Sequence, residues 1–196
     1  MKKRESQKPA KKQKRETKKA PGMFQVYRAS AIAIGLFIVY AAIGFWLLYN
    51  PFVARNFSEP FTGFVAKTAG WLFRIFGADT AGSGTVLSVG GTSFSIAFGC
   101  NGLEALVIYI AALLASPFTW KSKIGGLVVG FIGNYIINQI RIIGLFLAAM
   151  IGEQQFQYAH TIVGQTFVIV LTMAIFLWWG SRYGQRKKAR SRAVLA

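Results

Sequence analysis

Three residue types that can support nucleophilic catalysis each occur once in the apolar part of the chain. Cys100 is the only cysteine of the 196 residues, and His160 is the only histidine. Arg141 is the only arginine inside an apolar run. A thiol attacks as a thiolate, which neighbouring cations favour, and a histidine can accept the thiol proton and return it to a leaving amine. Because Arg141 can also stabilise an oxyanion, the three residues predict a site with a cysteine nucleophile.

Each of these residues also has a structural interpretation. A lone membrane cysteine is commonly a small apolar filler, and a histidine just before a span is often interfacial. An arginine within an apolar helix needs an anion, water or headgroups, and by default it indicates a functional site. The structural partner for Arg141 is Glu104, as an ion pair. One cysteine and one histidine are too few soft ligands for a metal, so we expect neither a metal nor a cofactor.

The composition indicates an integral membrane protein with basic ends. The chain is 54% hydrophobic, yet its formal net charge is +17. Of the 23 Lys and Arg residues, 11 lie in residues 1–28 and 6 in residues 182–192, which leaves 6 between them. Basic tails that flank apolar spans follow the positive-inside rule more often than they bind nucleic acid. A single cysteine excludes an internal disulfide.

Four apolar stretches predict a membrane all-α fold, since about 20 apolar residues cross the hydrocarbon core. We expect the spans at about residues 29–49, 103–118, 124–150 and 161–180. They form a single integral-membrane domain, residues 29–180. Residues 1–28 are expected to be a disordered basic tail, and residues 181–196 a second basic tail.

The distribution of basic residues predicts the topology of these spans. With the N-terminus inside, residues 119–123 and both tails also lie inside, where anionic lipid headgroups attract them. Residues 50–100 and 152–160 then lie outside, the latter as a short polar loop. The inside regions carry 11, 2 and 6 basic residues, whereas the outside regions carry only Arg55, Lys67 and Arg74. Both termini are therefore expected in the cytoplasm.

The segment before the second span predicts a short helix and a β-hairpin. Residues 61–77 place Phe and Trp at helical spacing, which is typical of an amphipathic helix in the membrane interface. An additional span is the alternative, but two cations disfavour it. Residues 77–84 are expected to be a loop. Residues 85–89 and 92–98 flank a Gly-Gly pair and predict a hairpin whose second strand leads to Cys100.

The three candidate residues are expected at one depth. Counted from the inner boundary of each span at about 1.5 Å per residue, Cys100, Arg141 and His160 lie at about 27, 26 and 29 Å. All three heights fall near the outer edge of a hydrocarbon core about 30 Å thick. The third stretch continues beyond Arg141, so we expect it to project outward or to bend at Gly144.

The same residues resemble the exosortase/archaeosortase family. The matching motifs are Cys100-Asn101-Gly102, then Asn138-Gln139-Ile140-Arg141, then His160. The similarity covers roughly residues 85–180 and is greatest to the small exosortase H type. Residues 1–84 show no such match.

The resemblance implies a cysteine protease or transpeptidase in a bacterial cytoplasmic membrane, with its active site on the extracytoplasmic face. Its partners would be exported proteins whose C-terminal tail holds a signature, possibly of the IPTLxxWG kind, then a transmembrane helix and a basic cluster. Cys100 would form a thioester, assisted by Arg141 and His160. The supporting residues would be Asn101, Gly102, Glu104 and Asn138.

The acceptor that releases the product stays open between water, a lipid amine and a glycan. The alternative function is a non-catalytic transporter or assembly subunit that contains a structural Glu104–Arg141 ion pair.

Overall fold

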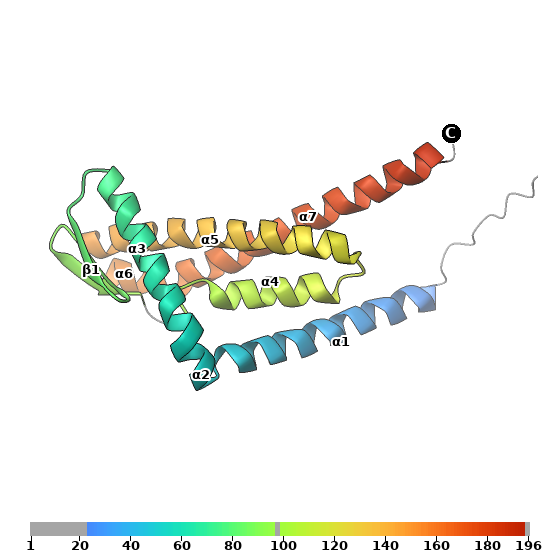
Figure 1. Ribbon diagram of the computed structural model, residues 1–196, viewed down its shortest axis with the longest axis horizontal. Coiled ribbons are helices and arrows are strands. Elements are labelled where there is room, and N and C mark those ends of the chain that lie inside the picture. The colour runs from blue at the N-terminus through green and yellow to red at the C-terminus, as the bar shows by residue number, and fades with distance from the viewer. Residues whose placement is uncertain (1–22, 97–98, 195–196) are drawn as a thin grey trace, which may run out of the picture.

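The computed structural model describes residues 23–96 and 99–194 and is mostly helical (Figure 1). Four helices run lengthwise and alternate in direction: α1 (Met23–Leu48), α4 (Leu103–Ala115), α5 (Trp120–Ile151) and α7 (Gln165–Val194). The start of α1, the end of α7 and the 116–119 connection lie at one end of the molecule. The remaining elements gather at the other end: α2 (Pro51–Val53), the π-helical turn η1 (Ala54–Ser58), α3 (Glu59–Ile75), a small sheet, α6 (Glu153–Tyr158) and the π-helical turn η2 (Ala159–Gly164).

Two of the described helices are long and apolar enough to cross a membrane, Ser30–Leu48 within α1 and the whole of α5. The apolar helices Leu103–Ala115 and Thr166–Arg182 are shorter. At 13 residues α4 rises only about 20 Å, because Ser116 is extended and Pro117 cannot continue the helix. The mostly helical membrane fold is confirmed, whereas the count of four spans stays a prediction.

Several segments that we expected to be irregular are helical. Residues 119–123, the expected short connection between the second and third spans, are helical from Trp120 onward, and α6 and the start of η2 occupy most of the expected loop at 152–160. At the N-terminal tail, which was expected to be disordered to residue 28, α1 already begins at Met23, and the basic tail from residue 181 continues α7 to Val194. Lys, Arg and Gln are good helix formers, and extending an existing helix costs far less than nucleating one. Beyond Arg141, α5 continues as one helix through Gly144 to Ile151.

The predicted β-hairpin is confirmed, with strands β2 (Val86–Val89) and β3 (Thr92–Ser95). Gly90 and Gly91 have φ angles of 56° and 84°, as a two-residue type I′ turn requires. Residues 97 and 98, the expected end of the second strand, lie outside the described residues.

The expected loop at 77–84 instead contains a third strand, β1 (Thr80–Ser83), which pairs antiparallel with β2. Its sequence, Thr-Ala-Gly-Ser, has no apolar alternation, so its pattern does not indicate a strand.

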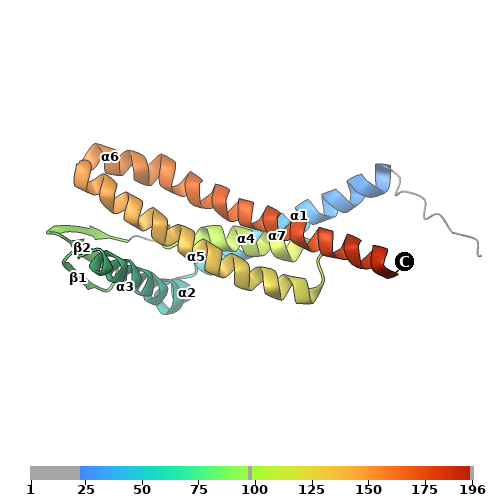
Figure 2. The ribbon, with the colours of Figure 1, turned by 90° about the horizontal axis from the view of Figure 1, so that it is seen from above.

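The amphipathic helix predicted at residues 61–77 is α3. It buries Val65, Ala69 and Phe73 against the sheet and α5, while Phe64 and Trp71 are 55% and 62% exposed. The helix lies across the end of the bundle (Figure 1), and α5 runs between α3 and α7 (Figure 2). This orientation agrees with an interfacial position in which exposed aromatic rings face lipid.

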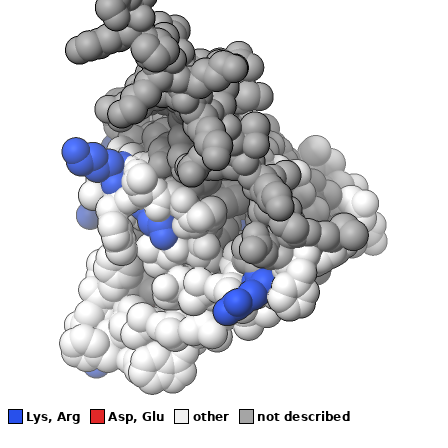
Figure 3. Space-filling model, turned by 90° about the vertical axis from the view of Figure 1, so that its right-hand side faces the viewer, with Lys and Arg blue, Asp and Glu red and all other residues white. Residues whose placement is uncertain are grey.

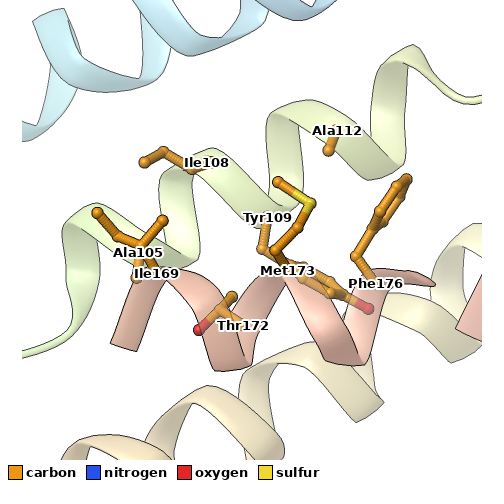
Figure 4. A pocket seen from close by; sticks show the side chains of 8 residues that line it. All are labelled: Ala105, Ile108, Tyr109, Ala112, Ile169, Thr172, Met173 and Phe176. Atoms are coloured by element: carbon orange, nitrogen blue, oxygen red, sulfur yellow. The ribbon is translucent and has the colours of Figure 1, made fainter. Parts of the chain in front are cut away.

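The helices pack closely around α4. The Tyr109 hydroxyl donates to the carbonyl oxygen of Gly126 on α5 at 2.8 Å. Between α4 and α7 a cavity of about 10 Å³ lies beside Tyr109, Thr172 and Phe176 (Figure 4). A space of this size holds about one water molecule, so it is not a ligand site.

We expect Gly130→Ala to destabilise the bundle, because a Cβ at residue 130 would lie 2.0 Å from Cε1 of Tyr109. Overpacking of this kind costs about 1–3 kcal/mol and should lower the midpoint of thermal unfolding in detergent. Gly35→Ala is the matched control, since no atom lies within 4 Å of its Cβ position. Equal midpoints for the two variants would contradict the close packing of α4 on α5.

Candidate active site

Cys100 lies in a tight loop between β3 and α4 and is 6% exposed. Gly99 and Gly102 on either side of it have φ angles of 91° and 82°, a conformation that favours glycine. Asn101 anchors the loop in two directions. Its Oδ1 accepts from the Leu103 N–H at 3.0 Å, and its Nδ2 donates to Oγ1 of Thr62 on α3 at 3.0 Å. The loop is therefore fixed between the start of α4 and the buried face of α3.

Gly102 also brings the loop against α5. Its carbonyl oxygen accepts from Nδ2 of Asn134 at 3.0 Å, and a Cβ at this position would lie 3.0 Å from Cγ of Asn138. Asn134 in turn accepts at Oδ1 from Thr172 on α7 at 3.1 Å. Asn138 is 1% exposed, and neither atom of its amide has a hydrogen-bond partner among the described residues.

Arg141 reaches from α5 to the cysteine loop and is 5% exposed. Its Nη1 donates to the carbonyl oxygen of Gly99 at 3.2 Å, and its Nη2 lies 3.8 Å from Sγ of Cys100. Its Nε has no acceptor within the part of the chain that the structure describes. The guanidinium group therefore contacts the loop of the candidate nucleophile directly. Glu104, the structural partner considered above, accepts at Oε1 from the Tyr49 hydroxyl at 2.5 Å.

His160 approaches Cys100 from the π-helical turn η2. Its Nδ1 lies 3.5 Å from Sγ of Cys100 and its Nε2 lies 3.9 Å away. Turns of this kind occur frequently at functional sites. The imidazole stacks on the ring of Phe156, with centroids 5.6 Å apart and 13° between the planes. An aromatic ring on α6 thus orients His160.

Gly164 leaves the space that Arg141 occupies. A Cβ at residue 164 would lie 2.9 Å from Nε of Arg141 and 2.9 Å from the carbonyl oxygen of Ala159. The turn η2 therefore presents His160 to the thiol with its first residues and makes room for the guanidinium with its last.

The structure brings together Cys100, Arg141 and His160, three residues from three separate elements. Asn101, Gly102 and Asn138 surround the loop, as their place in the motifs suggested. Four further residues that pattern reading missed also shape the site: Thr62, Asn134, Phe156 and Gly164. Only Asn134 had a sequence signal, because it lies four residues before Asn138 and so on the same helical face. The catalytic roles of all these residues stay a prediction.

The charge state of the thiol differs from the expectation. Burial raises the pKa of Cys100, the Arg141 cation opposes that rise, and the Glu104 anion adds to it. Desolvation disfavours the thiolate form, and its effect on the pKa of Cys100 is larger than that of the neighbouring cation. The resting group is therefore a protonated thiol, which needs a base within reach at the moment of attack.

Among the described residues no group of three or more His, Cys, Asp or Glu side chains is placed to hold a metal ion.

Because the chain has one cysteine, its thiol titration can be followed by alkylation. We expect the rate of modification by iodoacetamide to rise with pH around a midpoint above the free-thiol pKa of about 8.5, since burial raises the pKa of Cys100. Arg141→Ala removes a cation and should move the midpoint up, whereas Glu104→Gln removes an anion and should move it down. Shifts of the opposite sign would contradict this account.

Gly164→Ala tests the space around Arg141 without changing a titratable group. Its methyl group should displace the guanidinium and raise the midpoint of Cys100 alkylation, in the same direction as Arg141→Ala but no further. Gly144→Ala, on the helix that carries Arg141, has no atom within 4 Å of its Cβ position and should leave the midpoint unchanged. An unaltered midpoint in Gly164→Ala would show that Arg141 does not depend on this glycine.

Comparison with known proteins extends the similarity beyond the three motifs. The family model of transmembrane exosortases matches residues 23–179, which includes α1, α3 and the sheet as well as the motif region. No curated protein and no solved structure matches the chain. The segment between residues 23 and 84, which motif similarity did not cover, is thus part of the shared sequence. The chain belongs to the transmembrane exosortase family, as its cysteine, arginine and histidine motifs predicted.

Proposed function

We propose that this protein is a membrane-embedded cysteine transpeptidase that cleaves the C-terminal sorting signals of exported proteins. The observation that carries the proposal is the position of Cys100, whose Sγ lies 3.5 Å from Nδ1 of His160 and 3.8 Å from Nη2 of Arg141. Membership of the exosortase family supports the same reaction class. A signature of the IPTLxxWG kind is the substrate motif suggested by the similarity to the exosortase H type.

The reaction begins when His160 takes the thiol proton and Sγ of Cys100 attacks the scissile carbonyl carbon. The tetrahedral intermediate collapses as the C–N bond breaks, and His160 returns the proton to the leaving amine. The helical tail departs and the exported protein remains as a thioester on Cys100. An acceptor, water or a nucleophile on a lipid or glycan, then attacks the thioester, gives its proton to His160 and releases the sulfur.

Arg141 supplies the positive charge that these steps require. The thiolate forms in a buried site where desolvation disfavours it, and the guanidinium group beside it offsets part of that cost. The same group lies within reach of the oxygen that becomes negative in the tetrahedral intermediate. Its second contact, to the Gly99 carbonyl, keeps it in place throughout. Asn101, Gly102 and Asn138 act by holding the loop, and Glu104 adjusts the acidity of the thiol.

The distribution of charge supports a site on the extracytoplasmic face. The end of the molecule shown in Figure 3 displays basic side chains and no acidic ones among the described residues. The basic residues of these helix ends include Arg28, Lys121, Lys123 and Arg182. By the positive-inside rule, this end of the molecule faces the cytoplasmic side of a bacterial inner membrane. Cys100 lies at the opposite end, where exported proteins emerge.

The proposal predicts that three substitutions each block processing of an exported reporter with a C-terminal sorting tail. Cys100→Ala should abolish cleavage because it removes the nucleophile. His160→Ala should slow cleavage by about 10²- to 10⁴-fold, the usual contribution of a general base, and Arg141→Ala by about 10²- to 10³-fold. Cleavage and membrane attachment are followed by immunoblotting of the reporter.

The non-catalytic alternative predicts the opposite pattern. If Arg141 serves only as the ion-pair partner of Glu104, Cys100→Ser is silent and the double variant Glu104→Arg, Arg141→Glu restores function. Normal processing by Cys100→Ala would overturn the proposed reaction.

A further inference from the structure

We propose that β3 is the recognition element for the sorting signal. The extended segment that precedes the scissile bond binds along the outer edge of β3 as a fourth strand of the sheet. This inference rests on the proposed function, because it concerns the same substrate that Cys100 attacks.

Within the part of the chain that the structure describes, the outer edge of β3 pairs with no other strand. The strand order is β1-β2-β3, so β3 has a neighbour on one side only. In an antiparallel ladder successive residues direct their N–H and C=O groups to alternate sides. The Ile96 N–H donates to the carbonyl oxygen of Thr85 at 2.9 Å and thus faces β2. Ser93 and Ser95 therefore direct their backbone groups away from β2, toward the open edge.

At the opposite edge of the sheet, a side chain of α3 contacts the start of β1. Arg74 donates from Nη2 to the carbonyl oxygen of Thr80 at 3.0 Å and from Nε to its hydroxyl group at 2.6 Å. Thr80 is the first residue of β1, so this side chain occupies the outer edge where the strand begins. The two edges thus differ, and only the β3 edge is left without such a contact among the described residues.

The sequence of β3 lacks the usual protection of an exposed edge. Natural edge strands commonly carry charges, proline or bulges that prevent pairing with another chain, whereas Thr92–Ser95 contains none of these residues. The serine hydroxyls are used within the hairpin, Ser93 with Ser88 at 2.6 Å and Ser95 with Thr85 at 3.5 Å. These contacts hold the register of β3 and leave its backbone for a partner, as in recognition by strand addition.

The position of β3 suits a peptide that must reach Cys100. The strand ends at Ser95, five positions before the cysteine. Ile96 and Cys100 belong to one buried cluster with Leu87 and Val89 of β2, so the inner face of the sheet packs against the site. From N- to C-terminus, the enzyme chain passes from β3 through Cys100 to α4. In the same direction, a sorting tail passes from its signature through the scissile bond to its membrane helix. A peptide parallel to β3 therefore delivers its carbonyl group to Cys100 and continues toward the membrane.

Proline substitutions test the edge directly. Ser93→Pro and Ser95→Pro each remove an outward N–H group while keeping the inward hydrogen bonds of β3, and proline is tolerated at such edge positions. Ser93→Ala and Ser95→Ala are the matched controls, because they keep the N–H groups. With a reporter bearing a sorting tail encoded in the same genome, in proteoliposomes, we expect each proline to raise KM about two- to tenfold, the range for one hydrogen bond, with little change in kcat.

Two further measurements separate recognition from damage to the site. The alkylation rate of Cys100 by iodoacetamide should be the same in the proline variants and the wild type. Synthetic tail peptides N-methylated at single backbone amides should lose processing at every second position before the scissile bond, the period of a strand.

The outcomes distinguish this inference from the proposed function. A wild-type enzyme that processes no sorting tail overturns both. Processing with unchanged KM in the proline variants, or N-methylation losses without a period of two, overturns strand addition alone.

Discussion

The burial of one cation is the constraint on which the site depends. Arg141 is 5% exposed on α5, and a buried charge is tolerated only when polar groups receive it. Its contacts are the carbonyl oxygen of Gly99 and the sulfur of Cys100. The loop must therefore lie against α5, which requires a residue without a side chain at position 102. The guanidinium also needs the space that Gly164 leaves on η2.

The end of the bundle is held together by a line of polar contacts that runs from the cysteine loop along α3. Asn101 binds Thr62, and one to two turns further along α3 Thr68 accepts from Gln139 at 2.8 Å and from Tyr135 at 2.6 Å. These hydrogen bonds join α3 to both the loop and α5 in a region of low dielectric, where a hydrogen bond is electrostatically stronger than in water. The sheet packs on the same helix. The amphipathic helix thus positions the nucleophile and the proposed peptide-binding edge in one rigid unit.

The thiol at the centre of the site is held in its protonated form. Burial outweighs the effect of Arg141 on the pKa of Cys100, so the sulfur has low nucleophilicity until a base takes its proton, the role proposed for His160. In the proposed reaction, this arrangement couples activation of the thiol to a substrate whose leaving amine later needs the same proton. It also protects the single cysteine from oxidation, since susceptibility follows thiolate character.

The sequence by itself determined the features that depend on local pattern or composition. Apolar runs gave the membrane helices, the Gly-Gly pair gave the hairpin turn, and the rarity of Cys100, Arg141 and His160 identified the candidate site. Only the tertiary structure decided what depends on contacts between distant segments. The strand β1 has no pattern of its own and exists because β2 pairs with it. Phe156 and Gly164 matter only because η2 folds back over Arg141, and the sign of the change in thiol pKa follows from burial, which no local pattern records.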